Sequence, residues 1–220
     1  MVVTIDRPPA NAMSPQLLPE GREAVERIRA EAPKAVVLTG AGDFFSGGVD
    51  LKLAPGFSPR EQEQMVAAIN QLFCAWYGLW LPVVAAVNGH AVAGGMILAL
   101  CADHRVGAEG ARYGLTEVRV GVPYPAAAIG VVRAELSAGV ARRLALGADL
   151  VGSEEALEFG LLDELLPPHG VLERGIEVAR NLAALPDGVY AETKRQLRGG
   201  TAAEIEQAIA SDPIASGWLG

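Results

Sequence analysis

The chain has 220 residues, half of them hydrophobic and one fifth charged, so it is long enough to bury the core of one large domain or two small ones. Its formal net charge of −8 argues against nucleic acid or an anionic membrane surface as the main partner. No apolar run is long enough to span a bilayer, and the two cysteines and three histidines lack the spacing of a redox pair or of metal ligands. We therefore expect a cytoplasmic protein with reduced thiols, no signal peptide and no metal site.

Strands and helices are predicted to alternate along the first half of the chain. Residues 1–5 are predicted to end a strand, and the segment RPPANAM then turns the chain. Ser14 and Pro15 are typical of an N-cap and a first helical residue, so a helix is expected from there to about Glu31. The apolar run over 34–40 predicts a buried strand. A capping box, Ser58 to Glu61, opens a helix whose apolar face we interpret as core or subunit contact: Met65, Val66, Ile69, Leu72, Phe73 and Trp76.

The second half of the chain continues the alternation and then becomes more helical. Thr201 to Glu204 has the pattern of a second capping box, so a last helix is expected to open there. The alternation predicts an α/β fold with at least partly parallel sheets and no linker that separates independent domains. The expected elements are strands over 82–88 and 103–108, an extended piece over 161–166, a short helix opening at Gly94, and helices over 138–147 and 153–159.

Two glycine-rich segments each follow a strand-like apolar run. They are 35–52, AVVLTGAGDFFSGGVDLK, and 83–100, VVAAVNGHAVAGGMILAL. Each predicts a buried strand that leads into a turn where glycines leave the backbone N–H groups accessible. Two such N–H groups aimed at one point suit a reaction in which an oxygen gains negative charge. The pair therefore predicts an enzyme that polarises a carbonyl.

Several segments resemble, in order and spacing, the crotonase family of enoyl-CoA hydratases and isomerases. They are RPPANAM, VVLTGAGDFFSGGVDL, PVVAAVNGHAVAGGMILALCADHRV, YGLTEVRVGVP and GSEEALEFGLLDELL, and they cover nearly the whole chain. The resemblance implies one continuous fold unit, with a spiral core of ββα turns over 1–137 and a helical C-terminal region for trimerisation over 138–220. It also implies acyl-CoA thioester substrates, a homotrimer or a hexamer of two trimers, and no cofactor beyond the coenzyme A that the substrate carries.

The resemblance places the two oxyanion donors on the backbone N–H groups of Val49 and Gly94. A glycine that opens a helix fits this role, because its N–H has no partner within the helix and lies at the positive end of the helix dipole. Both donors would favour the enolate oxygen that forms when a thioester loses its α-proton. Asp50 is expected to hold the loop by bonding nearby N–H groups. The residues expected to bind substrate beside these donors are Ser46, Gly48, Asp50, Leu51 and Ala93.

The acids of the site separate the branches of the family. Its hydratases carry two glutamates, and the matching positions here are Ile97 and Glu117. One carboxylate suffices to take a proton from the α-carbon of a 3-enoyl thioester and return it to the γ-carbon. The pattern therefore resembles the Δ3-Δ2 enoyl-CoA isomerase branch. Burial against apolar neighbours such as Ile97 is expected to raise the pKa of Glu117 and improve it as a proton shuttle.

Single residues distinguish the other branches of the family and the other roles that these positions could have. Tyr124 stands in a segment that resembles methylmalonyl-CoA decarboxylases, but those lack a glutamate at the position of Glu117, so Tyr124 is expected to contact substrate as a wall of the acyl pocket. The dienoyl-CoA isomerases carry an acid where this chain has Pro125. Three hypotheses follow: an isomerase, a hydratase in which Glu117 and a fixed water act alone, and a non-catalytic acyl-CoA binder. Ile97 and ends that look short for the family motivate the third.

Overall fold

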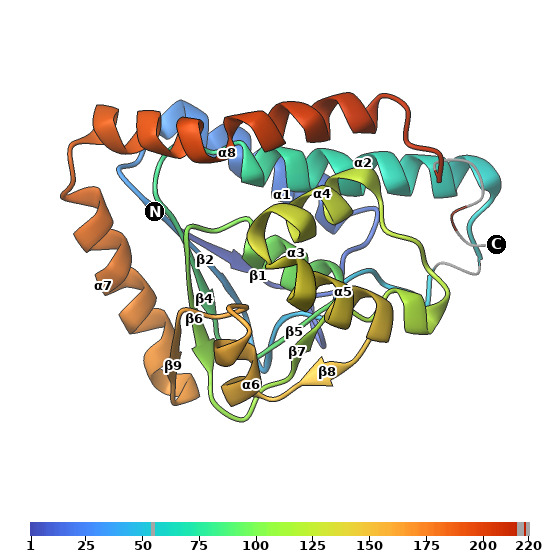
Figure 1. Ribbon diagram of the computed structural model, residues 1–220, viewed down its shortest axis with the longest axis horizontal. Coiled ribbons are helices and arrows are strands. Elements are labelled where there is room, and N and C mark those ends of the chain that lie inside the picture. Colours follow the sequence, from blue (N-terminus) through green and yellow to red (C-terminus); the bar gives the residue numbers. More distant parts are fainter. Residues whose placement is uncertain (54–55, 215–217, 219–220) are drawn as a thin grey trace.

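The larger of two sheets supplies the centre of the molecule. The computed structural model describes residues 1–53, 56–214 and 218, and Figure 1 shows helices arranged around the strands. The five strands of this sheet are all parallel, and their spatial order follows the sequence. Every residue of the middle strand is buried, as the apolar run predicted. In order, the strands are β1 (Val2–Ile5), β2 (Val36–Gly40), β4 (Val83–Val87), β6 (His104–Ala108) and β9 (Glu164–Leu166).

The smaller sheet consists of four short strands, three of which follow a long strand directly. The chain turns from β2 into β3, from β4 into β5 and from β6 into β7. At Gly89 the turn needs glycine, because a Cβ would collide with the backbone carbonyl of Asp43. The strands are β3 (Phe44–Ser46), β5 (His90–Val92) and β7 (Tyr113–Gly114), which pair in parallel, and β8 (Leu150–Val151), which pairs antiparallel with β7.

The repeating unit is a long strand, a short strand and then helical structure. It occurs as β2–β3–α2, as β4–β5–α3, and as β6–β7 followed by a 3-10 turn and α4. The predicted α/β fold with a ββα spiral core is therefore confirmed. The helices are α1 (Leu17–Glu31), α2 (Pro59–Tyr77), α3 (Gly94–Leu100), α4 (Ala126–Glu135), α5 (Ala138–Gly147), α6 (Ser153–Glu158), α7 (Val171–Ala183) and α8 (Asp187–Ile209), with 3-10 turns at Val118–Val120 and Pro168–Gly170.

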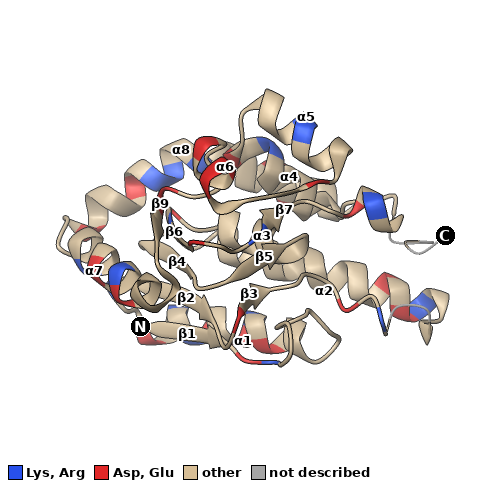
Figure 2. Cartoon of the chain, turned by 90° about the horizontal axis from the view of Figure 1, so that it is seen from below, with Lys and Arg blue, Asp and Glu red and all other residues tan. Residues whose placement is uncertain are grey.

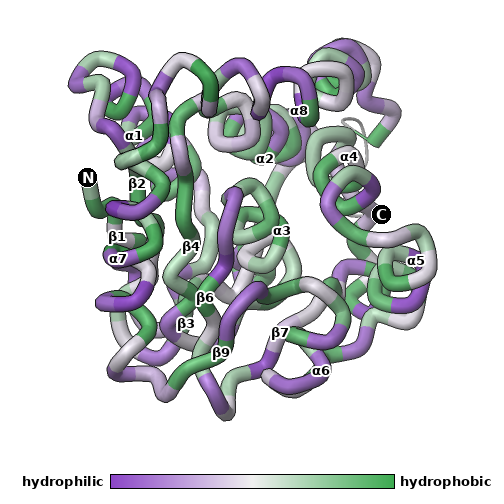
Figure 3. The backbone as a smooth tube through the Cα atoms, turned by 60° about the vertical axis from the view of Figure 1, so that its left-hand side comes forward, coloured by the Kyte–Doolittle hydropathy of each residue, from purple (hydrophilic) through white to green (hydrophobic). Residues whose placement is uncertain are grey.

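The long helices cover the sheets from outside. Helix α7 packs on β2, β4 and β6, and α8 runs along α2 and α4 (Figure 1). Figure 2 shows Lys, Arg, Asp and Glu mainly on the outer helices, with the inner strands largely free of charge. In Figure 3 the hydrophobic colour follows β4, whereas α7 and α8 alternate between hydrophobic and hydrophilic stretches. This is the distribution expected of amphipathic helices that close a buried parallel sheet.

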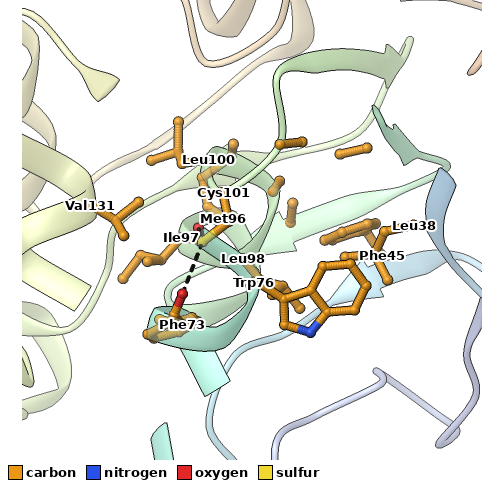
Figure 4. Close-up of a cluster of buried hydrophobic side chains, with 14 of the residues drawn as sticks. Leu38, Phe45, Phe73, Trp76, Met96, Ile97, Leu98, Leu100, Cys101 and Val131 are labelled. Carbon is orange, nitrogen blue, oxygen red and sulfur yellow. Dashed lines mark hydrogen bonds between the residues drawn. The ribbon is translucent and has the colours of Figure 1, made fainter. Parts of the chain in front are cut away.

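Helix α3 lies inside the molecule, and all seven of its residues are buried. Figure 4 shows its side chains between those of α2 and those of the strands. The thiol of Cys101 lies 3.4 Å from the Ile97 carbonyl oxygen and 3.9 Å from that of Phe73, so this cysteine is a buried core residue. The apolar face predicted for α2 packs here, with Met65, Val66, Ile69, Leu72, Phe73 and Trp76 all buried.

Most of the predicted elements are found, and two helix starts are wrong. The Ser58 capping box with proline at the first helical position is present, and α5 has the predicted bounds. Helix α1 begins at Leu17 instead of Pro15, although the Ser14 hydroxyl accepts the Leu17 N–H at 3.1 Å and caps the turn that leads into the helix. No helix opens at Thr201, since α8 runs unbroken from Asp187 to Ile209.

Tertiary packing explains why α8 ignores the local cap at Thr201. Lys194 is anchored on one side of that residue, where its Nζ lies 2.7 Å from an Asp103 carboxylate oxygen. On the other side Ile205 is buried and lies directly over Gly130 of α4, where a Cβ would leave it no room. These contacts bury Lys194 and Ile205 on the two sides of Thr201 and hold α8 as one continuous helix. They outweigh a capping signal worth only about 1 kcal/mol.

The region 138–220 contributes strands as well as helices, because β8 joins the smaller sheet and β9 the larger one. Its proposed role in trimerisation stays a prediction. None of the helices in the described residues combines the length and the apolar character needed to cross a membrane.

Candidate active site

Three short parallel strands bring the predicted site residues to one edge of the smaller sheet. The loop 47–49 follows β3, Gly94 follows β5, and Glu117 follows β7. Since the strands are parallel, their carboxyl ends meet at the same edge. A cavity of about 70 Å³ lies there, and it is lined by Gly47, Val49, Leu51, Ile69, Phe73, Ala93, Gly94, Ile97, Thr116, Glu117, Val122, Pro125, Ala128 and Trp218.

The loop that carries Val49 is pinned by its neighbours. The Met13 N–H donates to the Gly48 carbonyl at 2.7 Å, and the Asp50 N–H donates back to the Met13 carbonyl at 2.8 Å. Gly48 has a φ of 80°, and a Cβ on it would lie 2.9 Å from the Ala93 Cβ and 3.0 Å from the Gly94 nitrogen. Only glycine fits both this backbone conformation and this contact, so Gly48 is the point where the two predicted oxyanion loops touch.

The first turn of the chain supports this loop through Asn11 and Arg7, two residues that the sequence analysis did not single out. Asn11 is buried, and its Nδ2 donates to the carbonyls of Ala41 and Phe44 at 2.9 and 2.7 Å. Arg7 pairs with Asp50 at 3.0 Å. The segment RPPANAM was the available signal, because a buried asparagine in a turn usually bonds backbone groups. Asp50 also accepts the Lys52 N–H on its Oδ1 at 3.2 Å, which is a bond to a nearby backbone N–H of the predicted kind.

Val49 and Gly94 both line the cavity. Within the described residues, neither N–H donates to a protein acceptor. Gly94 opens α3, where the first N–H groups have no partner inside the helix. Ala93 before it has φ 52° and ψ −127°, a conformation that non-glycine residues adopt only when the surroundings impose it. Its own N–H is held by the Gly114 carbonyl at 2.8 Å. The pair is therefore fixed in place and able to bind an oxyanion.

Glu117 is an acid in an apolar pocket. It follows β7, is 7 % exposed, and its Oε2 has no hydrogen-bond partner among the described residues. Burial raises the pKa of this carboxyl from 4.5 to about 7, and contacts with its own backbone, the Tyr124 hydroxyl and the Thr116 backbone oppose that rise only in part. The predicted upward shift is confirmed. A carboxyl that titrates near neutral pH can both accept and return a proton.

Ile97 lines the same cavity from α3, one turn after Gly94, and it is buried. Among the described residues that line the cavity, Glu117 alone carries a titratable side chain. Nowhere in the described residues do three or more His, Cys, Asp or Glu side chains form a group that could hold a metal ion. The site thus combines one carboxylate, two free N–H groups and apolar walls.

The remaining predicted residues lie around the cavity in different ways. Leu51 and Ala93 line it, whereas Ser46 lies beneath it, where its hydroxyl donates to the Asn11 carbonyl at 2.8 Å and accepts the Gly48 N–H at 3.2 Å. The Tyr124 ring borders a neighbouring groove next to α4 and α8, and its buried hydroxyl lies beside Glu117.

Trp218 was missed by the sequence analysis, although it is buried and forms part of the cavity wall. Its indole N–H donates to the Pro123 carbonyl at 3.1 Å. No local signal marks such a residue, because the contact spans 95 positions of the chain. A larger hollow of about 420 Å³ lies between β1 and α1, but it contains none of the residues that carry the chemistry.

Known proteins share this fold and much of this sequence. Residues 1–213 match the family model described as enoyl-CoA hydratase/isomerase. The (E)-benzylidenesuccinyl-CoA hydratase of Thauera aromatica is 31% identical over 204 residues, which are 90% of this chain and 78% of that protein. A crystal structure of an enoyl-CoA hydratase from Mycobacterium ulcerans has a TM-score of 0.91 at 29% identity, covering 100% of this chain and 95% of that one. An apo structure of an enoyl-CoA isomerase from Mycobacterium tuberculosis has a TM-score of 0.88 at 30% identity, covering 96% and 93%.

Proposed function

The chain belongs to the enoyl-CoA hydratase/isomerase family, and we propose that it moves the double bond of a 3-enoyl-CoA to the 2-position. The observation that carries this proposal is that Glu117 and Ile97 line the same small cavity, so the two positions that hold acids in a hydratase hold only one here. A hydratase of this family uses a second acid to hold water, and an isoleucine side chain cannot do so. A single buried carboxylate instead suits a proton transfer within the substrate.

The reaction divides between Glu117 and the two N–H groups. The ionised carboxylate of Glu117 takes a proton from the α-carbon, and the electron pair of that C–H bond moves into the thioester to give a dienolate. The N–H groups of Val49 and Gly94 hold the negative oxygen, a contribution of about 3 kcal/mol for each such donor. Protonated Glu117 then returns the proton to the γ-carbon, and the double bond is left between the α- and β-carbons. Atoms and charge balance without a co-reactant.

The apolar walls serve the same reaction. The cavity that Glu117 lines has apolar walls, formed by Ile69 and Phe73 of α2, Ile97 of α3 and Ala128 of α4. They exclude water that would otherwise protonate the dienolate at the wrong time or stabilise the ionised carboxylate. The carboxylate of an acid with a pKa of about 7 is a stronger base than one at the ordinary value of 4.5, so it takes the α-proton more readily.

Hydration of a 2-enoyl-CoA is the second candidate activity. It is favoured by the names of relatives, since both the Thauera aromatica protein and the Mycobacterium ulcerans structure are called hydratases. In this chain such a reaction would rest on Glu117 and one water held without a second carboxylate. We also propose that coenzyme A enters only as part of the substrate and that the working form is a homotrimer or a hexamer of two trimers.

The test compares two substrates on the same protein. A 3-hexenoyl-CoA and a crotonyl-CoA are incubated separately with the wild type, and the products are separated by liquid chromatography. Conversion of the first to the 2-enoyl ester, lost in Glu117→Gln and retained in the exposed-site control Glu109→Gln, is expected. Hydration of crotonyl-CoA that outpaces isomerisation would replace the proposal with the hydratase. Turnover of neither ester would overturn both.

A further inference from the structure

Two buried polar atoms next to each other lack hydrogen bonds. They are Oε2 of Glu117 and the hydroxyl oxygen of Tyr124, and neither has a partner with full hydrogen-bond geometry among the described residues. The two groups are nevertheless close enough for each to shift the pKa of the other. Buried polar groups in proteins are nearly always paired, so two unpaired neighbours point to a contact made at another stage of the reaction.

Tyr124 is held firmly from both sides. The carbonyl before it, on Pro123, accepts the Trp218 indole N–H at 3.1 Å. Just after it, the Ala126 N–H donates to Asp212 at 2.8 Å and the Ala127 N–H donates to Asn70 at 2.9 Å. The start of α4 is therefore tied to α2 and to the segment after α8. A residue so fixed can position a neighbour, because its own hydroxyl has little freedom to move away.

No other described side chain is as well placed as Tyr124 to donate a hydrogen bond to the Glu117 carboxyl. The cavity walls from α2, α3 and α4 are apolar, and among the described lining residues Glu117 is the one titratable group. The nearest charged side chain along the chain, Arg119, is exposed and pairs with Asp149. Thr116 and Trp218 also line the cavity, but the Trp218 N–H already donates to Pro123 and Thr116 acts on Glu117 through its backbone. The Tyr124 hydroxyl is therefore the side-chain donor best placed to act on this carboxyl.

We propose that Tyr124 is a positioning residue that donates its hydroxyl hydrogen to the ionised Glu117 carboxylate and holds its other oxygen toward the cavity. The proposal deepens the proton-shuttle role of Glu117 and rests on it. The phenol keeps its own proton throughout. The proton taken from the substrate resides on Glu117 and leaves from Glu117, so Tyr124 exchanges nothing with the substrate. Burial raises the pKa of the phenol further above 10, which keeps it a donor at every working pH.

The proposal makes a signed prediction for Tyr124→Phe. Without the phenol hydroxyl, the ionised Glu117 carboxylate loses a hydrogen-bond donor that stabilises it. Burial then raises the pKa of Glu117 further, to above about 7. A hydrogen bond to a charged group is worth roughly one to two pH units on this scale. In the pH–rate profile, the rise in rate that accompanies ionisation of Glu117 moves to higher pH by the same amount. At pH 7 the rate falls roughly tenfold, and it recovers at alkaline pH.

Two measurements on the full chain test this. The pKa of Glu117 is followed by ¹³C NMR of protein labelled at the glutamate carboxyl, with the signal assigned by its absence in Glu117→Gln. The exchange of the α-protons of butyryl-CoA in heavy water is followed across pH. Tyr77→Phe is the matched control, because Tyr77 also donates to a carboxylate, Glu135, at 2.9 Å but lies outside the cavity. It should leave both readouts unchanged.

The outcomes separate the possible roles. An unchanged Glu117 pKa in a folded Tyr124→Phe overturns the proposal, as does a rate loss of equal size at every pH, which would mean direct contact with substrate. Fluorotyrosine at position 124 guards against a folding defect, since its more acidic hydroxyl should lower the pKa of Glu117. If the pKa of Glu117 shifts in Tyr124→Phe but the wild type exchanges no α-protons, the proposed activity is refuted. The hydrogen bond between Tyr124 and Glu117 is then still supported.

Discussion

Two buried polar clusters in this molecule differ in how fully they are paired. Beside α8, Asp103 receives the ammonium of Lys194 at 2.7 Å, the guanidinium of Arg198 at 3.1 Å and the backbone N–H of Val83 at 2.9 Å. Arg198 pairs in addition with Glu135 at 3.0 Å. In the cavity, by contrast, Glu117 and Tyr124 each keep a buried oxygen without a hydrogen bond.

The difference in pairing indicates different roles for the two clusters. A buried charge that is removed from its partners costs several kcal/mol, so the cluster around Asp103 fixes α8 on the sheet and has no capacity left for a ligand. An unpaired carboxyl stores free energy that a substrate or a proton can release, and its pKa moves toward the working pH. We expect the Asp103 cluster to govern folding and the Glu117 cluster to govern reaction rate, with little exchange between the roles.

Replacement of Glu117 by glutamine should have the largest effect on rate. Loss of the general base is expected to slow α-proton exchange about a thousandfold. Stability should move the other way. The folded protein holds this proton up to a pH of about 7, whereas the unfolded chain releases it near 4.5. Stability of the wild type therefore falls as pH rises between these values, by at most about 3 kcal/mol.

Urea unfolding at pH 5 and pH 8 measures that second effect. Glu117→Gln should lose the pH dependence and become more stable than the wild type at pH 8. The same pH dependence in both proteins would show that Glu117 is not desolvated in the folded state.

Substitution of Gly48 by alanine should rank second. Its Cβ would press on Ala93 and on the Gly94 nitrogen, which displaces an oxyanion donor and slows exchange about a hundredfold. Gly42→Ala is the matched control, because Gly42 also has a positive φ, 69°, but nothing within 4 Å of its Cβ position. Both variants should lose about 1 kcal/mol of stability from backbone strain. Equal rates in the two variants would contradict the assigned donor.

The reverse pattern is expected for Asp103→Asn. Removal of this carboxylate charge leaves the buried Lys194 uncompensated and should lower the free energy of unfolding by about 3 kcal/mol. Exchange per folded molecule and the pKa of Glu117 should stay at the wild-type values. Urea titration and the exchange assay measure the two quantities, with the exposed Asp6→Asn as control. A slower reaction at full folding would couple the two clusters and end the division of roles.

The smallest effect is expected at Trp218, and it concerns which substrate is used. The indole closes a cavity of about 70 Å³, which favours short acyl chains. Trp218→Leu should raise the ratio of kcat/KM for an eight-carbon ester over that for a four-carbon ester several-fold. Trp76→Leu removes a tryptophan that is equally buried but outside the cavity, and it should leave this ratio unchanged. An unchanged ratio in both variants would remove Trp218 from the acyl pocket.

The sequence by itself determined the parts of the fold that depend on local signals. The apolar run over 82–88 predicted a buried strand, and the Ser58 capping box predicted the start of α2. Glycines at 48 and 94 marked the two turns of the site, whereas Glu117 was assigned through the resemblance of its segment to the crotonase family. These features succeed because strand burial, capping and turn chemistry act between residues that are near each other along the chain.

The tertiary structure decided what depends on contacts between distant segments. Strands of two or three residues, such as β3 and β7, have too few positions for a periodic pattern, yet their parallel pairing is what gathers the site. Local sequence signals also failed to predict three other features. These are the continuity of α8 through Thr201, the position of Trp218 in the cavity wall, and the closeness of Tyr124 to Glu117. Each is set by packing free energy between elements that the sequence separates, and that energy outweighs the weaker preferences of the local segment.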